Sequence, residues 1–235
     1  MKLKSLVLMT LVLVLVSVPV LGQGQGQGMQ GMMPEGQSDI EPDEVVATVN
    51  GEELLFEELE EITGIQNLTM QLMQSNPQFA QFLTESEAGE KFLNAYRRDS
   101  VDELIQQELL RQKADELDIE VTEEKEDEYF SQVKEQLDSQ REQQDLSEEE
   151  YIEQLNQQIP DQEIESMDDI KELVLAEADL RTQVLIEEHI VDEIDEDLDE
   201  EEMQQAQLEQ NEDFQAYVDE LREEADVEVM EDLFE

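Results

Sequence analysis

The chain has 235 residues, 66 of them acidic and 13 basic, for a formal net charge of −53. This length allows one domain, or one main domain with small additions. Disulfides are excluded because there is no cysteine, and nucleic acid is excluded as a partner because phosphate would be repelled.

Residues 1–22 are predicted to be a secretory signal peptide. Lys2 and Lys4 precede an apolar run from Leu6 to Val16, Pro19 ends it, and cleavage is expected after Gly22. The protein is then exported, periplasmic or extracellular, and soluble without stable membrane insertion. The alternative is an uncleaved anchor, although 11 to 16 apolar residues are short for a membrane span.

Residues 23–42 are predicted to be a flexible linker, since 23–37 read QGQGQGMQGMMPEGQ and show no periodicity. Beyond the leader, Leu, Ile, Val and Phe make up about a quarter of the residues, above the roughly 20% typical of disordered acidic chains. The rest of the chain is therefore expected to fold, with an extremely acidic surface.

The folded region is expected to begin with a β-strand. Val45 to Val49 is rich in β-branched residues, and Asn50-Gly51 supplies the two residues that best tolerate a positive φ. After an acidic start, Leu55, Leu59 and Ile62 recur at helical spacing. The pattern predicts a strand, a turn and a helix over about 55–75.

Further helices are predicted at about 88–117, 123–143, 148–158, 167–194 and 203–225. Thr122 is the expected cap of the helix that starts at 123. Ser147 and Glu150 form a predicted capping box at the next helix, with Leu146 and Tyr151 at the spacing of a hydrophobic staple.

The spacing of apolar residues changes from helical to alternating at the end of the chain. Val227 and Val229 alternate with acidic residues, which predicts a short strand over about 227–230. Two short strands at opposite ends of the folded region, about 45–49 and 227–230, can pair if helices cover one face. The predicted fold is therefore mainly α with a small sheet; two unrelated strands or disordered ends are the alternative.

Two stretches, VVATVNGEELLFEEL (45–59) and VDELIQQELLRQKADELDIEVTEE (101–124), together resemble the N-terminal chaperone domain of SurA-type and PrsA-type folding factors. The resemblance covers roughly Val45 to Ile194, with a weaker echo at Val218 to Met230. It implies a SurA N-like helical chaperone domain over 43–194, closed by the C-terminal helix and strand of 213–235.

Factors of this family commonly carry parvulin prolyl-isomerase domains, which need about 90 residues, glycine-rich turns and a histidine-containing site. The segment 195–212 is where such a domain would sit, and Asp192 to Glu212 is short, acidic and free of Gly, Pro, His and aromatic residues. The resemblance therefore implies a chaperone domain without the isomerase.

No residue cluster predicts catalysis, a cofactor or a metal site. His189, the only histidine, is interpreted as a solvated helix position. Asp195, Asp197 and Asp199 imitate the start of a calcium loop, but Glu200 replaces its glycine and Ala206 its final glutamate. The chain is thus expected not to be an enzyme.

An apolar cluster around the Asn76-Pro77 break is the candidate client-binding site. Methionine and phenylalanine side chains can adapt to many client sequences. The alternative is that these side chains simply complete the core. The candidate residues are Leu68, Met70, Leu72, Met73, Phe79 and Phe82.

The function hypothesis is an exported, ATP-independent chaperone, a holdase for unfolded or partly folded secreted and envelope polypeptides. The alternative is an envelope adaptor or structural protein with one fixed partner. The acidic residues are spread over every helix, which favours adaptation to high salt. Binding of cations or of a basic partner is the other explanation of the acidity.

Overall fold

The computed structural model describes residues 40–158, 164–191 and 198–234. The predicted signal peptide, nearly all of the predicted linker and positions 195–197 lie outside this part of the chain. The structure forms two compact units. We call residues 40–113 and 214–234 the sheet unit, and the described part of 114–213 the helical unit. No helix among the described residues combines the length and the apolar character needed to cross a membrane.

The sheet unit begins with a β-hairpin. β1 (Val45–Val49) pairs antiparallel with β2 (Glu52–Leu55). The predicted turn is confirmed: Asn50 has φ 54° and Gly51 φ 88°, the left-handed values of a tight hairpin. The prediction that the acidic residues after the turn begin a helix is wrong. A two-residue turn returns the chain alongside β1, and Leu54 is thereby buried opposite Ala47.

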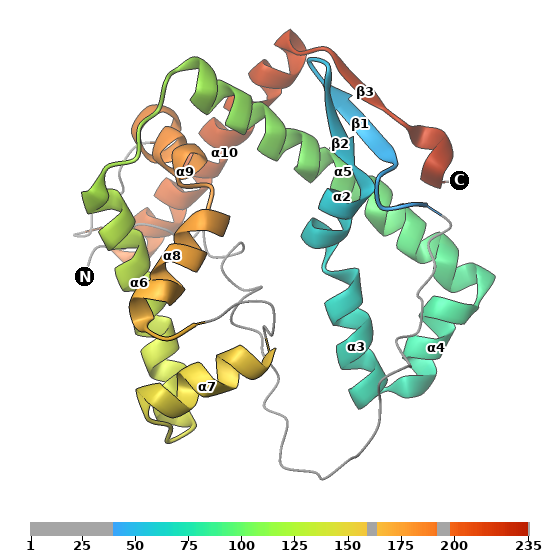
Figure 1. The fold of residues 1–235 in the computed structure, drawn as a ribbon. Helices are drawn as coiled ribbons and strands as arrows, with labels where there is room; N and C mark the ends of the chain where they lie inside the picture. The colour runs from blue at the N-terminus through green and yellow to red at the C-terminus, as the bar shows by residue number, and fades with distance from the viewer. Residues whose placement is uncertain (1–39, 159–163, 192–197, 235) are drawn as a thin grey trace. The chain divides into compact units, whose positions relative to one another are not determined.

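The two ends of the folded region pair as predicted. β3 (Val227–Val229) is antiparallel to β1, with Ala47 opposite Val229, so the strand order is β2-β1-β3 (Figure 1). The N–H group of Met230 extends the pairing by donating to the carbonyl of Val46 at 3.0 Å. A 3-10 turn, η2 (Glu231–Phe234), follows.

Four helices follow the hairpin: α2 (Phe56–Thr63), α3 (Ile65–Ser75), α4 (Pro77–Glu85) and α5 (Glu87–Glu116). The single helix expected over 55–75 is divided at Gly64, which adopts φ 58° and ends α2. α4 was not expected. It begins because Pro77 occupies its first turn and the Asn76 side chain accepts a hydrogen bond from the Phe79 N–H at 3.3 Å.

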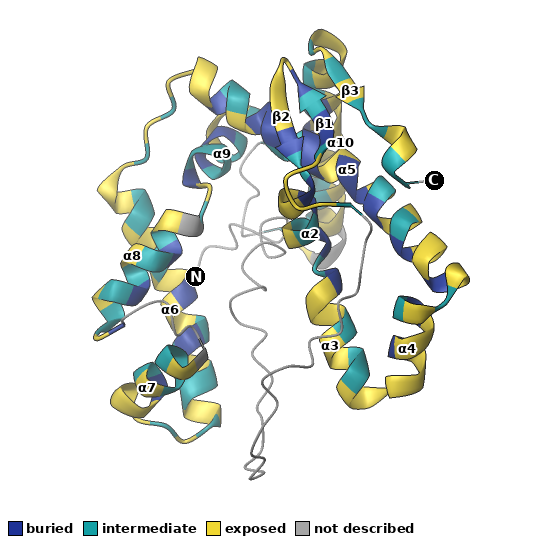
Figure 2. Ribbon diagram, turned by 45° about the vertical axis from the view of Figure 1, so that its right-hand side comes forward, coloured by how far each residue is buried: buried dark blue, intermediate teal, exposed yellow. Residues whose placement is uncertain are grey.

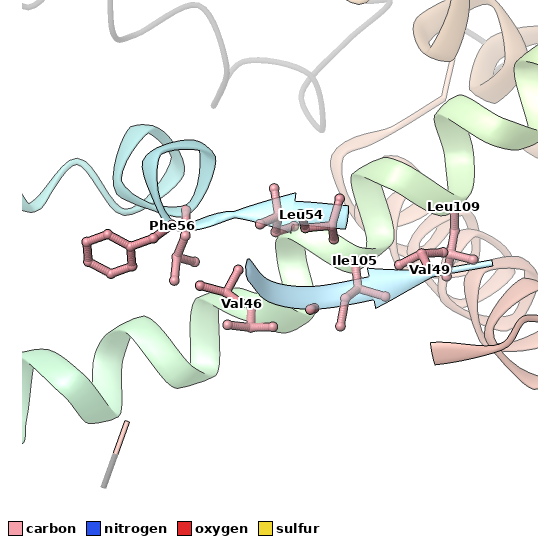
Figure 3. Close-up of a cluster of buried hydrophobic side chains, with 10 residues drawn as sticks. Val46, Val49, Leu54, Phe56, Ile105 and Leu109 are labelled. Carbon is pink, nitrogen blue, oxygen red and sulfur yellow. The ribbon is translucent and has the colours of Figure 1, made fainter. Parts of the chain in front are cut away.

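The core of the sheet unit lies between the hairpin and α5 (Figure 3). Val46, Val49 and Ile105 are fully buried. The pairing of β1 with β2 shifts register between Val45 and Ala47, and β1 does not bury alternate side chains. Its buried residues instead pack in one cluster with a stripe of α5 at helical spacing, and the members of the two elements are Val46, Ala47, Val49, Val101, Leu104, Ile105 and Leu109. Leu221 and Ala225, at the end of α10 and just beyond it, pack against this core and bring the C-terminal strand to it.

The helical unit contains α6 (Glu123–Gln143), α7 (Glu148–Gln158), α8 (Met167–Glu177), α9 (Leu180–Leu185), a π-helical turn η1 (Ile186–Ile190) and the first part of α10 (Glu200–Glu224). The predicted caps are confirmed. Thr122 accepts from the Lys125 N–H at 3.3 Å, and Ser147 and Glu150 exchange hydrogen bonds at 2.9 and 3.3 Å.

The continuous helix expected over 167–194 is broken. Ala178 is extended, and the Asp179 side chain caps a new helix by accepting from the Thr182 N–H at 3.1 Å. A capping aspartate competes with helix continuation because its carboxylate satisfies a free backbone donor. The separate core of this unit is formed by Val133, Leu137, Tyr151, Ile164, Ile170 and Val174.

Candidate binding surface

Most of the candidate client-binding residues lie at the surface. Leu68 and Met70 on α3 are 46% and 53% exposed, and Phe79 and Phe82 on α4 are 45% and 46% exposed. Leu72 and Met73 are half-buried. Figure 2 shows how much of α3 and α4 is exposed. The alternative was that these residues only complete the core. The four exposed side chains do not.

The two phenylalanines of α4 contact one another. Their ring centroids are 6.1 Å apart and the ring planes are inclined by 16°. They are three positions apart and therefore lie on one side of the helix. They present aromatic area that is already ordered, which lowers the entropy lost when a partner binds.

Sequence reasoning missed two further exposed aromatic residues. Phe92 and Tyr96, both on α5, are 57% and 43% exposed. Their spacing of four residues places them on one face, and this spacing was the signal that could have found them. The Tyr96 hydroxyl donates to the carbonyl of Thr63 at 3.4 Å, which brings this part of α5 next to the end of α2.

A buried arginine connects α5 to α2. Arg97 is only 4% exposed, and its Nε donates to Oε1 of Glu60 at 2.7 Å. Its guanidinium carbon lies 5.4 Å from the centre of the Phe56 ring, within the range of a cation–π contact. The pair therefore orients the helix that leads into α3.

A glycine brings α4 and α5 together. A Cβ atom at Gly89 would lie 2.3 Å from the carbonyl oxygen of Phe82 and 2.4 Å from that of Leu83. Only glycine permits this approach of the two backbones. The end of α4, and with it Phe82, is thus positioned directly against the start of α5.

One hollow of the sheet unit lies away from α3 and α4. A cavity of about 400 Å³ lies between α5 and the C-terminal half of α10, with Ile105, Leu109 and Val218 among its lining residues. Arg222 at its rim is paired with Asp102 at 2.6 Å. Charged and amide groups make up much of the remaining lining, so this cavity differs in character from the exposed surface of α3 and α4.

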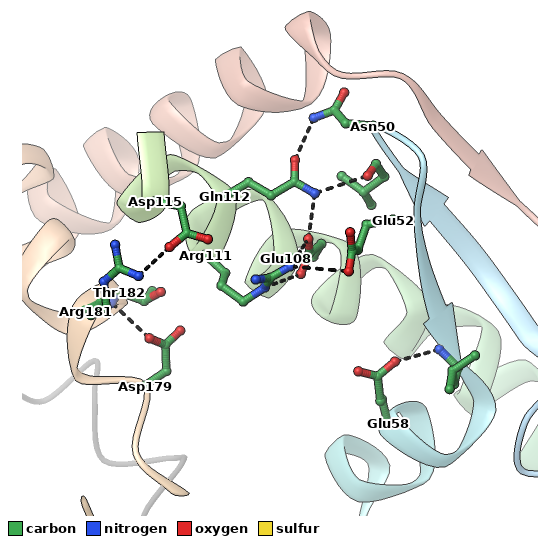
Figure 4. A network of polar contacts seen from close by, with 12 residues as sticks. Asn50, Glu52, Glu58, Glu108, Arg111, Gln112, Asp115, Asp179, Arg181 and Thr182 are labelled. Carbon is green, nitrogen blue, oxygen red and sulfur yellow. Dashed lines mark hydrogen bonds and ion pairs between the residues drawn. The ribbon is translucent and has the colours of Figure 1, made fainter. Parts of the chain in front are cut away.

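The buried polar groups near the hairpin are used in a structural network (Figure 4). Glu108 is 7% exposed and accepts two hydrogen bonds from Arg111, at 2.6 and 2.7 Å, and one from Gln112 at 2.6 Å. Gln112 also donates to the carbonyl of Val49 at 3.1 Å and accepts from Asn50 at 2.7 Å. This network joins the hairpin turn to α5.

The structure places His189 and Asp199, the residues considered above for metal or acid–base chemistry, in a helical turn and at a helix start. His189 is exposed within the π-helical turn. Asp199 directly precedes α10 and caps it: its carboxylate accepts from the Glu202 N–H at 3.0 Å, and the Glu202 carboxylate accepts from the Asp199 N–H at 3.2 Å. Within the described ranges no three His, Cys, Asp or Glu side chains are grouped so as to hold a metal ion.

Comparison with known proteins assigns the chain to a family. A family model described as the SurA-like N-terminal domain matches residues 1–165. No curated protein and no solved structure matches the chain. The match spans the hairpin, the helices that carry the exposed apolar surface, and α6 and α7. The chain therefore belongs to the SurA-like N-terminal domain family.

Proposed function

We propose that this protein is an exported, ATP-independent chaperone that holds unfolded or partly folded secreted and envelope polypeptides, without isomerase or other enzyme activity. Its family supports a chaperone-like role. The client-binding surface consists of the exposed side chains of α3 and α4, namely Leu68, Met70, Phe79 and Phe82, with Leu72 and Met73 behind them and Phe92 and Tyr96 of α5 added to the earlier prediction.

The observation that carries the proposal is the exposure of the Phe79–Phe82 pair. Each ring is nearly half exposed, and the two are held against each other. Exposed apolar side chains cost free energy in water, and apolar segments of an unfolded client recover that energy when they cover them. Release needs no nucleotide, because the client leaves when its own folding buries the same apolar segments.

Suppression of aggregation tests this function. A chemically denatured client is diluted into stoichiometric amounts of the protein, and light scattering is followed at high salt. The wild type should suppress scattering, and the double variant Phe79→Ser/Phe82→Ser should lose most of the effect. The matched control is Leu208→Ser on α10, which removes another exposed apolar side chain, 64% exposed, and should retain full suppression.

The outcomes separate the alternatives. Wild-type protein that leaves scattering unchanged would reject the holdase. A control variant as defective as the double variant would reject the assignment of the surface. One partner recovered in stoichiometric amount, with no effect on unrelated clients, would support the fixed-partner adaptor. An X-Pro isomerisation assay should show no rate increase above the spontaneous reaction.

A further inference from the structure

The exposed apolar helices coincide with an uncharged stretch of the chain. From Ile62 to Thr84, 23 consecutive residues include no Asp, Glu, Lys or Arg, whereas a third of the whole chain is charged. No other uncharged run after Asp43 is longer than seven residues. The absence of charge is therefore confined to one part of the folded protein.

The structure places most of this stretch at the surface, where a polyanionic protein would normally carry carboxylates. It covers all of α3 and all of α4 except Glu85. Between the apolar side chains most of the exposed positions are amides, including Gln66, Gln71, Gln74 and Gln78. Amides keep the surface hydrated and add no charge.

The charge distribution indicates which partners this surface fits. A basic partner would be attracted to the acidic residues that cover most of the other helices and would need no uncharged area. An acidic partner is repelled by those helices and can approach closely only where no carboxylate faces it. High salt removes the long-range part of this repulsion, so that only groups in direct contact still matter.

We propose that the surface formed by α3 and α4 binds uncharged, apolar stretches of polypeptides that are themselves acidic, and that this binding becomes tighter as salt increases. The inference rests on the proposed chaperone function and names its class of client. Apolar contacts supply the affinity, and the uncharged surface removes the like-charge penalty at the contact.

Two fluorescent peptides test the proposal by anisotropy. Both carry the same Phe- and Leu-containing centre, flanked in one by glutamates and in the other by lysines. The Glu-flanked peptide should bind the full-length protein about 10-fold more tightly at about 2 M than at about 0.1 M NaCl. Binding of the Lys-flanked peptide should weaken over the same range, so that it no longer binds more tightly than the Glu-flanked peptide.

Added charge on the protein provides the matched test. Gln71→Glu/Gln78→Glu places two carboxylates on the surface. It should weaken binding of the Glu-flanked peptide by about 5-fold at about 0.2 M salt, and the affinity should nearly recover at about 2 M salt. Gln132→Glu/Gln157→Glu adds the same charge at exposed positions on α6 and α7. It should leave binding unchanged; circular dichroism verifies that both variants fold.

The results distinguish this inference from the function on which it rests. Wild-type protein that suppresses aggregation but binds only the Lys-flanked peptide at every salt concentration would overturn the acidic-client proposal and leave the chaperone intact. Equal weakening by both pairs of substitutions would overturn the role of α3 and α4. Absence of binding to either peptide, together with absence of aggregation suppression, would reject the chaperone function itself.

Discussion

Asn50 and Asp226 exchange two hydrogen bonds across 176 positions of sequence. The Asn50 N–H donates to the carbonyl of Asp226 at 2.8 Å, and the Asp226 N–H donates to Oδ1 of Asn50 at 2.9 Å. The Asn50 side chain also donates to Gln112 on α5. One turn residue thus joins the hairpin, the long helix and the start of β3.

Substitution at Asn50 should loosen the C-terminal strand. Asn50→Ala loses both side-chain bonds and puts an L-residue without a polar side chain at φ 54°, so the free energy of unfolding should fall by about 2–3 kcal/mol. Asn50→Gly keeps the turn and should lose only about 1–2 kcal/mol. Denaturant unfolding measures the stability of both variants, and hydrogen exchange at the Met230 N–H should accelerate in each of them. Variants as stable as the wild type would contradict the role of Asn50.

The Arg97–Glu60 pair should behave as a buried ion pair. Replacing one partner, as in Glu60→Gln or Arg97→Met, leaves the other inside the protein and should cost about 3–5 kcal/mol of stability. The double variant Arg97→Met/Glu60→Met should recover much of that loss, because apolar groups of similar volume replace both charges. A double-mutant cycle by denaturant unfolding measures the coupling; strictly additive losses would show that the pair does not interact.

Gly89→Ala should destabilise the junction of α4 and α5. In an ordinary helix interior this substitution stabilises by up to about 1 kcal/mol. Here the new Cβ would lie 2.3 Å from a backbone oxygen that cannot move independently of α4. We expect a lower melting temperature and weaker client binding through displacement of Phe82. A melting temperature equal to or above that of the wild type would contradict the close approach.

Two helix caps predict how the helical unit responds to acid. The Ser147 side chain lowers the pKa of Glu150 below its ordinary value, and backbone N–H donation from Glu165, with Ser166, lowers the pKa of Asp169. Because both pKa values are lowered on folding, their stabilisation is present above the unfolded pKa and is lost as pH falls through the folded pKa.

Melts from about pH 6 to about pH 2, in high salt to suppress net-charge repulsion, test these caps. Glu150→Gln/Asp169→Asn should have a lower melting temperature at neutral pH and a shallower decline in acid. Glu149 and Asp168 lie next to these residues in the first turns of the same helices and are not the capping carboxylates, so Glu149→Gln/Asp168→Asn is the control and should decline like the wild type. Identical acid declines for both double variants would rule out the caps as the cause.

Salt should stabilise the whole protein. At least ten Lys and Arg side chains in the described part of the chain form ion pairs with carboxylates, among them Lys125 with Glu187 at 2.6 Å and Arg98 with Glu231 at 2.5 Å. With 66 acidic residues and 13 basic ones, most carboxylates nevertheless repel one another.

We expect the melting temperature to rise by on the order of 10 °C between about 0.1 M and 2 M NaCl as this repulsion is screened. Sucrose, which is excluded from protein surfaces but does not screen charge, is the control and should give a smaller rise. A rise in melting temperature that saturates at millimolar Mg²⁺ would instead support specific cation binding. A melting temperature that does not change with salt would contradict adaptation to high salt.

The candidate site was only partly predictable. Leu68, Met70, Phe79 and Phe82 were identified from their residue types and lie exposed. Their exposure was not predictable, because a Met- and Phe-rich helix pattern is equally typical of a buried core. The four-residue spacing of Phe92 and Tyr96 was visible in the sequence, but the position of Tyr96 next to Thr63 was not, because it is created by the packing of α5 on α2.

Local chemistry in the sequence determined the hairpin turn at Asn50-Gly51, the helix caps at Thr122 and Ser147, and the mainly helical fold, since each depends on residues a few positions apart. Tertiary structure decided where helices break and what stays exposed. β2 exists because the turn returns the chain to β1. The surface of α3 and α4 stays exposed because the hairpin, α2, α5, the end of α10 and β3 form the core of the sheet unit. Such outcomes depend on contacts between distant segments, whose free energies no local pattern contains.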